Sequence, residues 1–322
     1  MTITSEQSTW FATTFSQLVA NVEKAVVGKT HVVQLAVTCL LAEGHLLLED
    51  FPGTGKTSLA RALAQTVQGK HSRIQFTPDL LPADVTGVTI YDQAKQRFEF
   101  HEGPIFATIV LADEINRASP KTQSALLEVM EESQVTVDGV THRVGRPFMV
   151  VATQNPIEQA GTYPLPEAQL DRFLMKTSLG YPDLTSTMQI LAAPQARTGT
   201  TLDAIITTDA VAGMSDLAAS VHVDPAVLEY VGRLAEATRS APEVLLGCSV
   251  RASLALIRCA RAWAAASGRT FVLPDDIKQL AGPVLAHRML LDPEEEYRGT
   301  TREGVLERLL EQLPAPQERV TT

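Results

Sequence analysis

Apolar residues recur along this chain with two spacings, and the change from one to the other divides the sequence. Over residues 1–181, short apolar runs of strand length alternate with segments in which apolar residues return every three or four positions. After Tyr181-Pro182-Asp183 only the helical spacing continues. The pattern therefore predicts an α/β half over residues 1–181 and an all-helical half over residues 182–322.

The individual elements follow from the same pattern. Helical spacing predicts helices near 10–26, 30–42, 56–67 and 121–132, and then near 185–192, 209–219, 225–239, 249–267, 275–288 and 302–313. Apolar runs predict strands at 46–49, 73–76, 109–112, 148–153 and 174–179. Alternation on both sides of a turn at 92–95 predicts one hairpin, and Asp138-Gly139 between alternating residues predicts a second.

The first predicted strand leads into a turn rich in proline and glycine that ends in Gly55-Lys56-Thr57. In such a loop the backbone N–H groups and the start of the following helix face a bound phosphate. Lys56 would reach the β- and γ-phosphates, and the Thr57 hydroxyl would bind Mg²⁺. Asp50 stands where the G-x-x-x-x-G-K-[ST] pattern has its first glycine. The predicted nucleotide-binding loop comprises Pro52, Gly53, Thr54, Gly55, Lys56, Thr57 and Ser58.

Two adjacent acids follow the apolar strand at 109–112. Ligands of open α/β sheets lie at the carboxyl ends of the strands, so Asp113 and Glu114 are placed where a nucleotide phosphate would be. Asp113 is predicted to hold Mg²⁺, and Glu114 to act as the base that polarises the attacking water. An acidic turn open to solvent is the alternative interpretation.

Two further polar residues follow or precede predicted strands. Asn155 comes just after the strand at 148–153, where its amide would bind the γ-phosphate and the attacking water, although Asn before Pro is equally typical of a turn. Arg172 directly precedes the last strand and is predicted to reach a phosphate across a subunit boundary. A surface ion pair with Asp171 or Glu167 is the alternative for Arg172.

Composition places the chain among globular proteins without a membrane span. It has 322 residues, of which 45% are hydrophobic and 20% charged. No apolar run reaches the length of about 18 residues that a membrane helix needs. The first lysine is Lys24, so the start of the chain lacks the basic region of a secretory signal. We therefore expect a cytoplasmic protein.

Charge and cysteine content narrow the function further. The net charge of −10 disfavours a protein whose main task is to grip a nucleic-acid backbone. Cys39, Cys248 and Cys259 lie far apart in apolar contexts without metal-ligand spacing, so buried thiols are expected.

Together these segments resemble the MoxR family of AAA+ ATPases, which belongs to the helix-2-insert clade. The resemblance rests on residues 52–57, 102–106, 111–118, 151–156, 165–173 and 272–276. The stretch Asp-Glu-Ile-Asn-Arg-Ala at 113–118 is the most specific part. The resemblance implies a P-loop AAA+ core with a parallel five-stranded sheet of order 5-1-4-3-2, followed by an α-helical lid. Residues 84–102 would be the helix-2 insert, and residues 134–145 the pre-sensor-1 hairpin.

The resemblance also assigns roles to single residues. By position, Asn155 is sensor 1, Arg172 the arginine finger and Arg251 sensor 2, while Val27 and Gly28 would flank the adenine. Val250 stands where the family pattern leads us to expect proline, which weakens the assignment of Arg251. The implied activity is ATP hydrolysis with Mg²⁺ in a ring, a hexamer, that remodels or matures a protein partner with a von Willebrand factor A-type domain.

Two other functions fit the same core. A nucleic-acid motor or loader would need basic hairpins, but residues 84–102 offer only Lys95 and Arg97 among several acids, and residues 134–146 only Arg143, Arg146 and His142. A nucleotide-dependent switch with little turnover, or the motor subunit of a metal chelatase, is the other alternative. Glu114 argues against a chain that cannot hydrolyse ATP.

Overall fold

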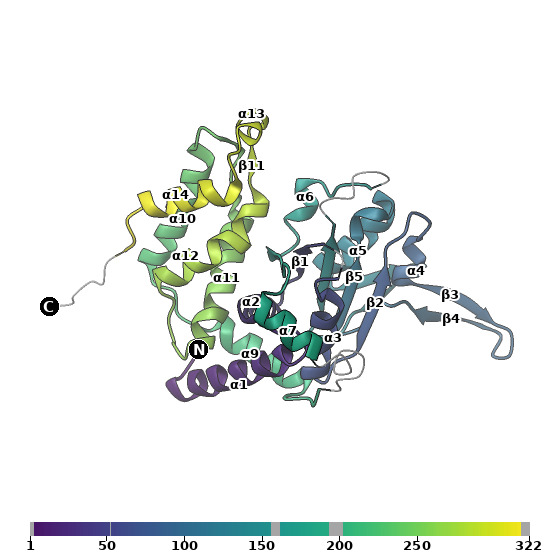
Figure 1. The fold of residues 1–322 in the computed structure, drawn as a ribbon. Helices are drawn as coiled ribbons and strands as arrows, with labels where there is room; N and C mark the ends of the chain where they lie inside the picture. The colour runs from purple at the N-terminus through teal and green to yellow at the C-terminus, as the bar shows by residue number, and fades with distance from the viewer. Residues whose placement is uncertain (1–2, 52, 156–161, 193–201, 317–322) are drawn as a thin grey trace. The chain divides into compact units, whose positions relative to one another are not determined.

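The computed structural model describes residues 3–51, 53–155, 162–192 and 202–316 (Figure 1). Contacts divide the chain into two compact units. The core unit comprises Gln17–Phe173 and Thr177–Gly213, and the C-terminal unit comprises Met1–Ser16, Leu174–Lys176 and Met214–Thr322. The boundary at 181/182 that the sequence predicts between core and lid stays a prediction.

A five-stranded sheet forms the centre of the core unit. Its strands are β1 (Leu46–Glu49), β2 (His71–Gln75), β5 (Ile109–Asp113), β8 (Met149–Gln154) and β9 (Met175–Thr177), in the order β2-β5-β8-β1-β9. The edge strand β9 contains residues of both units. The pairs β2–β5, β5–β8 and β1–β8 are parallel. Numbered along the chain and read from the β9 edge, this order is 5-1-4-3-2, which confirms the predicted fold class.

The central strands are buried along nearly their whole length, as expected for a parallel sheet covered on both faces. All five residues of β5 are buried, and so are the first five of β8. The sheet is flanked by helices (Figure 1). Those of the core unit include α2 (Thr30–Leu41), α3 (Lys56–Thr66), α5 (Pro120–Glu132), α6 (Glu167–Leu170) and α7 (Leu184–Ala192). Helix α1 (Ser5–Glu23) contributes residues to both units.

Both hairpins expected from alternation are present. After the short helix α4 (Pro82–Thr86), β3 (Gly87–Asp92) pairs antiparallel with β4 (Arg97–Glu102), and β6 (Gln134–Val137) pairs antiparallel with β7 (Val140–Arg143). Their aromatic residues connect the two hairpins, because the rings of Phe100 and His142 stack with centroids 3.9 Å apart. Hairpin β3–β4 extends away from the central sheet (Figure 1).

The described part of the C-terminal unit is mainly helical and contains a short two-stranded ribbon. Its helices include α10 (Pro225–Ser240), α11 (Val250–Ala266), α12 (Pro274–Leu285), α13 (Pro293–Tyr297) and α14 (Arg302–Gln312), and α9 (Thr208–Ala219) leads into it. Side chains of Asp224, Ser249 and Thr301 cap the starts of α10, α11 and α14. The ribbon pairs β10 (Val244–Leu246) with β11 (Leu290–Leu291), strands too short for alternation to reveal.

The three cysteines are buried, as the sequence predicts. Burial raises the pKa of the Cys259 thiol to about 12, so this side chain stays protonated and unreactive at neutral pH. Among the described helices, none combines the length and the apolar character required to cross a membrane.

Candidate functional site

The loop between β1 and α3 has the backbone conformation of a phosphate-binding loop. Gly53 and Gly55 have φ angles of +84° and +101°, which L side chains rarely adopt. A Cβ added at either position would meet nothing within 4 Å, so conformation rather than space requires glycine. Helix α3 begins directly at Lys56, and its unpaired N–H groups are therefore available to an anion. Pro52 lies outside the described residues.

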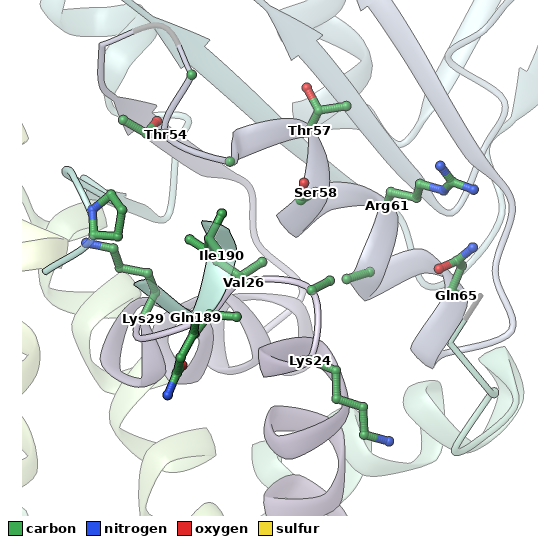
Figure 2. Close-up of a pocket in the computed structure, with 16 residues that line it drawn as sticks. Lys24, Val26, Lys29, Thr54, Thr57, Ser58, Arg61, Gln65, Gln189 and Ile190 are labelled. Carbon is green, nitrogen blue, oxygen red and sulfur yellow. The ribbon is translucent and has the colours of Figure 1, made fainter. Parts of the chain in front are cut away.

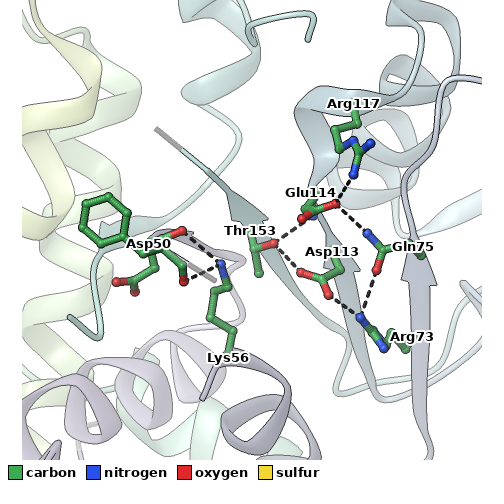
Figure 3. Close-up of polar contacts among 9 residues, drawn as sticks. Asp50, Lys56, Arg73, Gln75, Asp113, Glu114, Arg117 and Thr153 are labelled. Atoms are coloured by element: carbon green, nitrogen blue, oxygen red, sulfur yellow. Dashed lines mark hydrogen bonds and ion pairs between the residues drawn. The ribbon is translucent and has the colours of Figure 1, made fainter. Parts of the chain in front are cut away.

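The Lys56 side chain reaches back across this loop. Its Nζ donates hydrogen bonds to the carbonyl oxygens of Asp50, at 3.0 Å, and of Phe51, at 3.3 Å (Figure 3). Both acceptors are neutral, whereas a phosphate oxygen is charged and forms a stronger hydrogen bond with an ammonium group. The lysine is thus placed beside the loop with partners that a phosphate can replace.

A cavity of about 310 Å³ adjoins the loop within the core unit (Figure 2). Three stretches of chain surround it: the loop with the first turns of α3, the connection between α1 and α2, and the segment that follows β9. The lining residues are Lys24, Ala25, Val26, Val27, Lys29, Gly53, Thr54, Gly55, Thr57, Ser58, Arg61, Ala62, Gln65, Pro182, Gln189 and Ile190.

The cavity lining suits a molecule with an anionic end and an apolar end. Lys24, Lys29 and Arg61 bring positive charge to its wall, in a chain that is acidic overall. Val27, predicted to flank adenine, lines the cavity. Gly28 has a φ of +75°, and a Cβ there would lie 2.0 Å from Ser186 Oγ, so the connection approaches α7 closely.

Asp113 is the last residue of β5, and both of its carboxylate oxygens have partners. Oδ1 accepts a hydrogen bond of 2.7 Å from the hydroxyl of Thr153, and Oδ2 forms an ion pair of 2.7 Å with Arg73 Nη2 (Figure 3). The residue is only 8% exposed. Because a buried carboxylate needs such partners, Arg73 stabilises the charge of Asp113.

Glu114 follows in a left-handed conformation with φ +57° and precedes a single 3₁₀ turn, Ile115–Arg117. Its Oε2 accepts hydrogen bonds from Gln75 Nε2 at 2.8 Å and from Arg117 Nη1 at 3.0 Å (Figure 3). Its backbone N–H donates to the Thr153 hydroxyl at 2.8 Å. A non-glycine residue in this conformation carries backbone strain of the kind that clusters at functional sites.

Sequence reasoning missed three of these partners, namely Arg73, Gln75 and Thr153. Arg73 and Gln75 are two residues apart on β2 and therefore project to the same face of the sheet. The register pairs them with Leu111 and Asp113 of β5. Their alternation along a strand is visible in the sequence, but which strand lies beside them is not.

Asn155 lies between the loop and the acids along the edge of the sheet. It directly follows β8, which pairs with β1 on one side and with β5 on the other, and it is buried. The N–H of Asp50, at the start of the loop, donates to the carbonyl of Gln154 at 3.0 Å. Strand order and register thus bring Lys56, Asp113, Glu114 and Asn155 to the same edge.

Two predicted residues lie apart from this group. Arg172 follows α6, and its Nη2 lies 3.1 Å from Glu131 Oε2 on α5, a partner that neither sequence interpretation anticipated. It is not among the described residues that line the cavity. Arg251 is the second residue of α11 in the C-terminal unit, and its assignment as sensor 2 stays a prediction.

Comparison with known proteins identifies the class that this fold and site define. Residues 45–175 match the ATPase family associated with various cellular activities (AAA), and residues 236–309 match the AAA lid domain. The protein is therefore an AAA ATPase, a class that binds nucleotide.

Relatives along almost the whole chain narrow this class to a family. Chaperone MoxR1 of Mycobacterium tuberculosis is 40% identical over 318 residues, covering 94% of this chain and 83% of that protein. Protein MoxR of Paracoccus denitrificans is 33% identical, covering 95% and 96%. The uncharacterized protein YeaC of Bacillus subtilis is 47% identical, covering 94% of each. The chain belongs to the MoxR family of AAA+ ATPases.

A solved structure agrees with the fold. The crystal structure of a protein assigned as an ATPase from Cytophaga hutchinsonii is 38% identical, with a TM-score of 0.90, and covers 97% of this chain and 98% of that one.

Proposed function

We propose that this protein hydrolyses ATP and uses the energy to remodel or mature a protein partner. The observation that carries the proposal is the position of Asp113, the last residue of β5, and of Glu114 directly after it, at the same sheet edge as the phosphate-binding loop. A binding module needs the loop but not a second acid held beside it. The relative named Chaperone MoxR1 supports the remodelling role.

Each polar group at the edge has a defined task in hydrolysis. Lys56 neutralises charge on the β- and γ-phosphates while Glu114 accepts a proton from the attacking water. The Asn155 amide orients that water and the γ-phosphate. Gln75 and Arg117 both donate to Oε2 of Glu114 and hold the carboxylate in place, so Oε1 is the oxygen from which Glu114 would act as the base.

The oxygens of Thr57 and Asp113 fit a magnesium ion, which prefers hard oxygen ligands. Magnesium bound there would neutralise charge between the β- and γ-phosphates. Arg73 now pairs with Oδ2 of Asp113, so this oxygen becomes a metal ligand only when the arginine shares or releases it.

We further propose that the active form is a homo-oligomeric ring, a hexamer, in which Arg172 of one subunit serves the site of the next. Arg172 is absent from the described lining of its own cavity, which supports a role toward a neighbour. An arginine supplied in this way stabilises the charge that develops on the transferred phosphate.

The proposed partner is a protein with a von Willebrand factor A-type domain in the cytoplasm, and the hairpins β3–β4 and β6–β7 are the proposed contact. Hairpin β3–β4 exposes Ile90, Tyr91 and Phe98. A nucleic-acid partner is disfavoured, because Lys95 and Arg97 of this hairpin are both bound to Glu99.

The test is a pair of substitutions, of which one should remove ATP binding and the other only ATP hydrolysis. Lys56→Ala should abolish ATP binding measured by calorimetry. Glu114→Gln should keep binding and lower phosphate release at least about 100-fold, the usual contribution of a general base. Lys70→Ala, which removes an exposed lysine beyond α3, is the control. Unchanged turnover in Glu114→Gln would overturn the base assignment, and no phosphate release by the unmodified protein would overturn the proposed activity.

A further inference from the structure

Asp50 occupies the loop position at which the sequence pattern has glycine, and its side chain is buried in the structure. The described residues with positive φ include Gly53 and Gly55 but not Asp50, so the backbone does not require glycine here. Asp50 is only 3% exposed. Its side chain therefore occupies a buried position that a glycine would leave empty.

The Asp50 carboxylate binds a second segment of the core unit. It accepts hydrogen bonds from the backbone N–H of Leu179 and, at 2.9 Å, from that of Gly180, just beyond β9. The carbonyl oxygen of the same residue accepts the hydrogen bond from Lys56 Nζ (Figure 3). One residue thus contacts both the phosphate-binding lysine and the chain that leads toward α7.

One further contact joins the loop to this segment, and another joins the segment to the connection between α1 and α2. The rings of Phe51 and Tyr181 stack with centroids 5.7 Å apart and planes 9° from parallel. Lys29 Nζ donates to the carbonyl oxygen of Tyr181 at 2.7 Å. We call Asp50 and Phe51, with their partners at 179–181, the loop clasp. Immediately after it the chain reaches Pro182, at the wall of the cavity.

The wall that follows the clasp lines the same cavity as the phosphate-binding loop. Pro182, Gln189 and Ile190 line it, and Val26 of the connection between α1 and α2 lines the same cavity (Figure 2). A nucleotide whose phosphates occupy the start of α3 must place its nucleoside toward the apolar part of the cavity. The separation between loop and wall therefore determines whether both ends of one nucleotide fit at once.

A buried carboxylate that accepts backbone N–H groups holds those groups in one geometry, because breaking the contact leaves both the charge and the donors unsatisfied. We propose that Asp50 is a positioning residue that sets the distance between the phosphate-binding loop and the nucleoside wall formed by Pro182, Gln189 and Ile190. This inference rests on the proposed ATP-binding function. It goes beyond that function by naming Asp50 as the residue that allows the phosphates and the nucleoside of one nucleotide to fit the cavity at the same time.

The experiment compares how Asp50→Ala affects binding and turnover. If the clasp positions the nucleoside wall, KM for ATP should rise about tenfold or more, while kcat at saturation changes by less than about twofold. The reason is that contacts with the nucleoside stabilise bound ATP and the transition state equally, so their loss weakens binding without slowing the chemical step. Inorganic tripolyphosphate has no nucleoside, so its inhibition constant should stay within about twofold of that of the unmodified protein.

A second variant and a control keep the proposal testable if Asp50→Ala does not fold. Tyr181→Ala removes a mostly exposed ring of the clasp and should raise KM in the same direction by a smaller factor. Asp84→Ala removes a carboxylate that accepts a backbone N–H outside the cavity, from Leu81, and should leave KM unchanged.

Other outcomes overturn the inference. A fall in kcat, or an equal loss of ATP and tripolyphosphate binding, would mean that Asp50 acts on the phosphate-binding loop itself. Unchanged kinetic constants in both Asp50→Ala and Tyr181→Ala would mean that the clasp has no role in binding. If the unmodified protein binds ATP without hydrolysing it, the proposed activity fails, yet calorimetric affinities for ATP and tripolyphosphate still test the clasp.

Discussion

A single hydroxyl group organises the two acids of the site. Thr153 donates its proton to Asp113 and accepts the backbone N–H of Glu114, so its donor and one acceptor site are both used. Thr153 lies on β8 and is fully buried, and its own position is fixed by the sheet. The acids therefore take their geometry from a neighbouring strand and not only from the strand that carries them.

Near the other end of β2, the environment of His71 disfavours the protonated, positively charged form of its imidazole ring. Burial is the main cause that lowers its pKa, and the positive charges of Arg61 and Arg73 lower it further. Its buried Nε2 has no hydrogen-bond partner among the residues that the structure describes. The neutral ring is thus the form that the folded protein favours.

This predicts how stability depends on pH. The unfolded chain binds a proton at a pKa of about 6.5, but the folded chain does so only at lower pH, so the free energy of unfolding should fall as pH falls below about 7. His71→Gln should reduce this slope, as measured by urea unfolding at pH 7.5, 6.5 and 5.5. His101→Gln, at an exposed site on β4, is the control. Equal slopes in the unmodified protein and His71→Gln would contradict the prediction.

At the scale of elements, hairpin β3–β4 exposes the aromatic side chain of Phe98, which contributes little to the packing of the folded monomer. Phe98 is 71% exposed although its ring contacts Tyr91 at a centroid distance of 5.1 Å. The basic residues nearby are bound to Glu99, so the hairpin offers an apolar surface with little free charge. Such a surface suits a protein partner better than a polyanion.

Phe98→Ser should therefore weaken binding of a protein client and leave ATP hydrolysis unchanged. Exposed aromatic anchors contribute about 2 kcal/mol to many interfaces, which corresponds to roughly thirtyfold weaker binding, so we expect the variant to need roughly thirtyfold more protein to protect heat-denatured citrate synthase from aggregation. Tyr297→Ser removes an aromatic side chain that is 95% exposed in the C-terminal unit and serves as the control. Equal protection by both variants would argue against this hairpin as the contact.

The same elements explain how much the sequence alone could predict. The alternation of β3 and β4 and the Asp138-Gly139 turn are local signals, so both hairpins could be located. The contacts of Arg73 and Gln75 with the acids depend on β2 lying beside β5, which is a property of the whole sheet. The resemblance to a family provided the strand order, but it gave no reason to examine the side chains on β2.

The contacts of the buried Asp50 carboxylate could not be predicted from the sequence for a similar reason. In the sequence it is only a departure from a glycine pattern, and the resemblance makes it tolerable without explaining it. Its partners, Leu179 and Gly180, are remote in sequence and contribute only backbone N–H groups, which carry no residue signature. A contact to backbone cannot be predicted from residue types.

For the whole molecule, the question is where Arg172 acts. Its guanidinium pairs with Glu131 of the same chain and its side chain is 29% exposed. This pairing fixes one end of a side chain that could otherwise sample many rotamers. An arginine held near the surface in this way is suited to a phosphate on a neighbouring subunit.

Mixing experiments test this arrangement. Arg172→Ala alone should lower ATP hydrolysis about 1,000-fold or more, the contribution of an arginine finger. Adding Glu114→Gln subunits, which are inactive but keep Arg172, should restore part of the phosphate release. Subunits that carry both substitutions are the matched control and should restore none. Full activity of Arg172→Ala alone would exclude the arginine finger, and no recovery on mixing would argue against action between subunits.

The stack of Phe100 on His142 has a mechanical consequence. Beyond the hairpin that carries Phe100 the chain continues into β5, which ends at Asp113, and beyond the hairpin that carries His142 it continues into β8, which precedes Asn155. A load on either hairpin is therefore divided between two adjacent strands at their amino ends. These strands are displaced together rather than sheared apart, so the acids and the amide can keep their mutual spacing under that load.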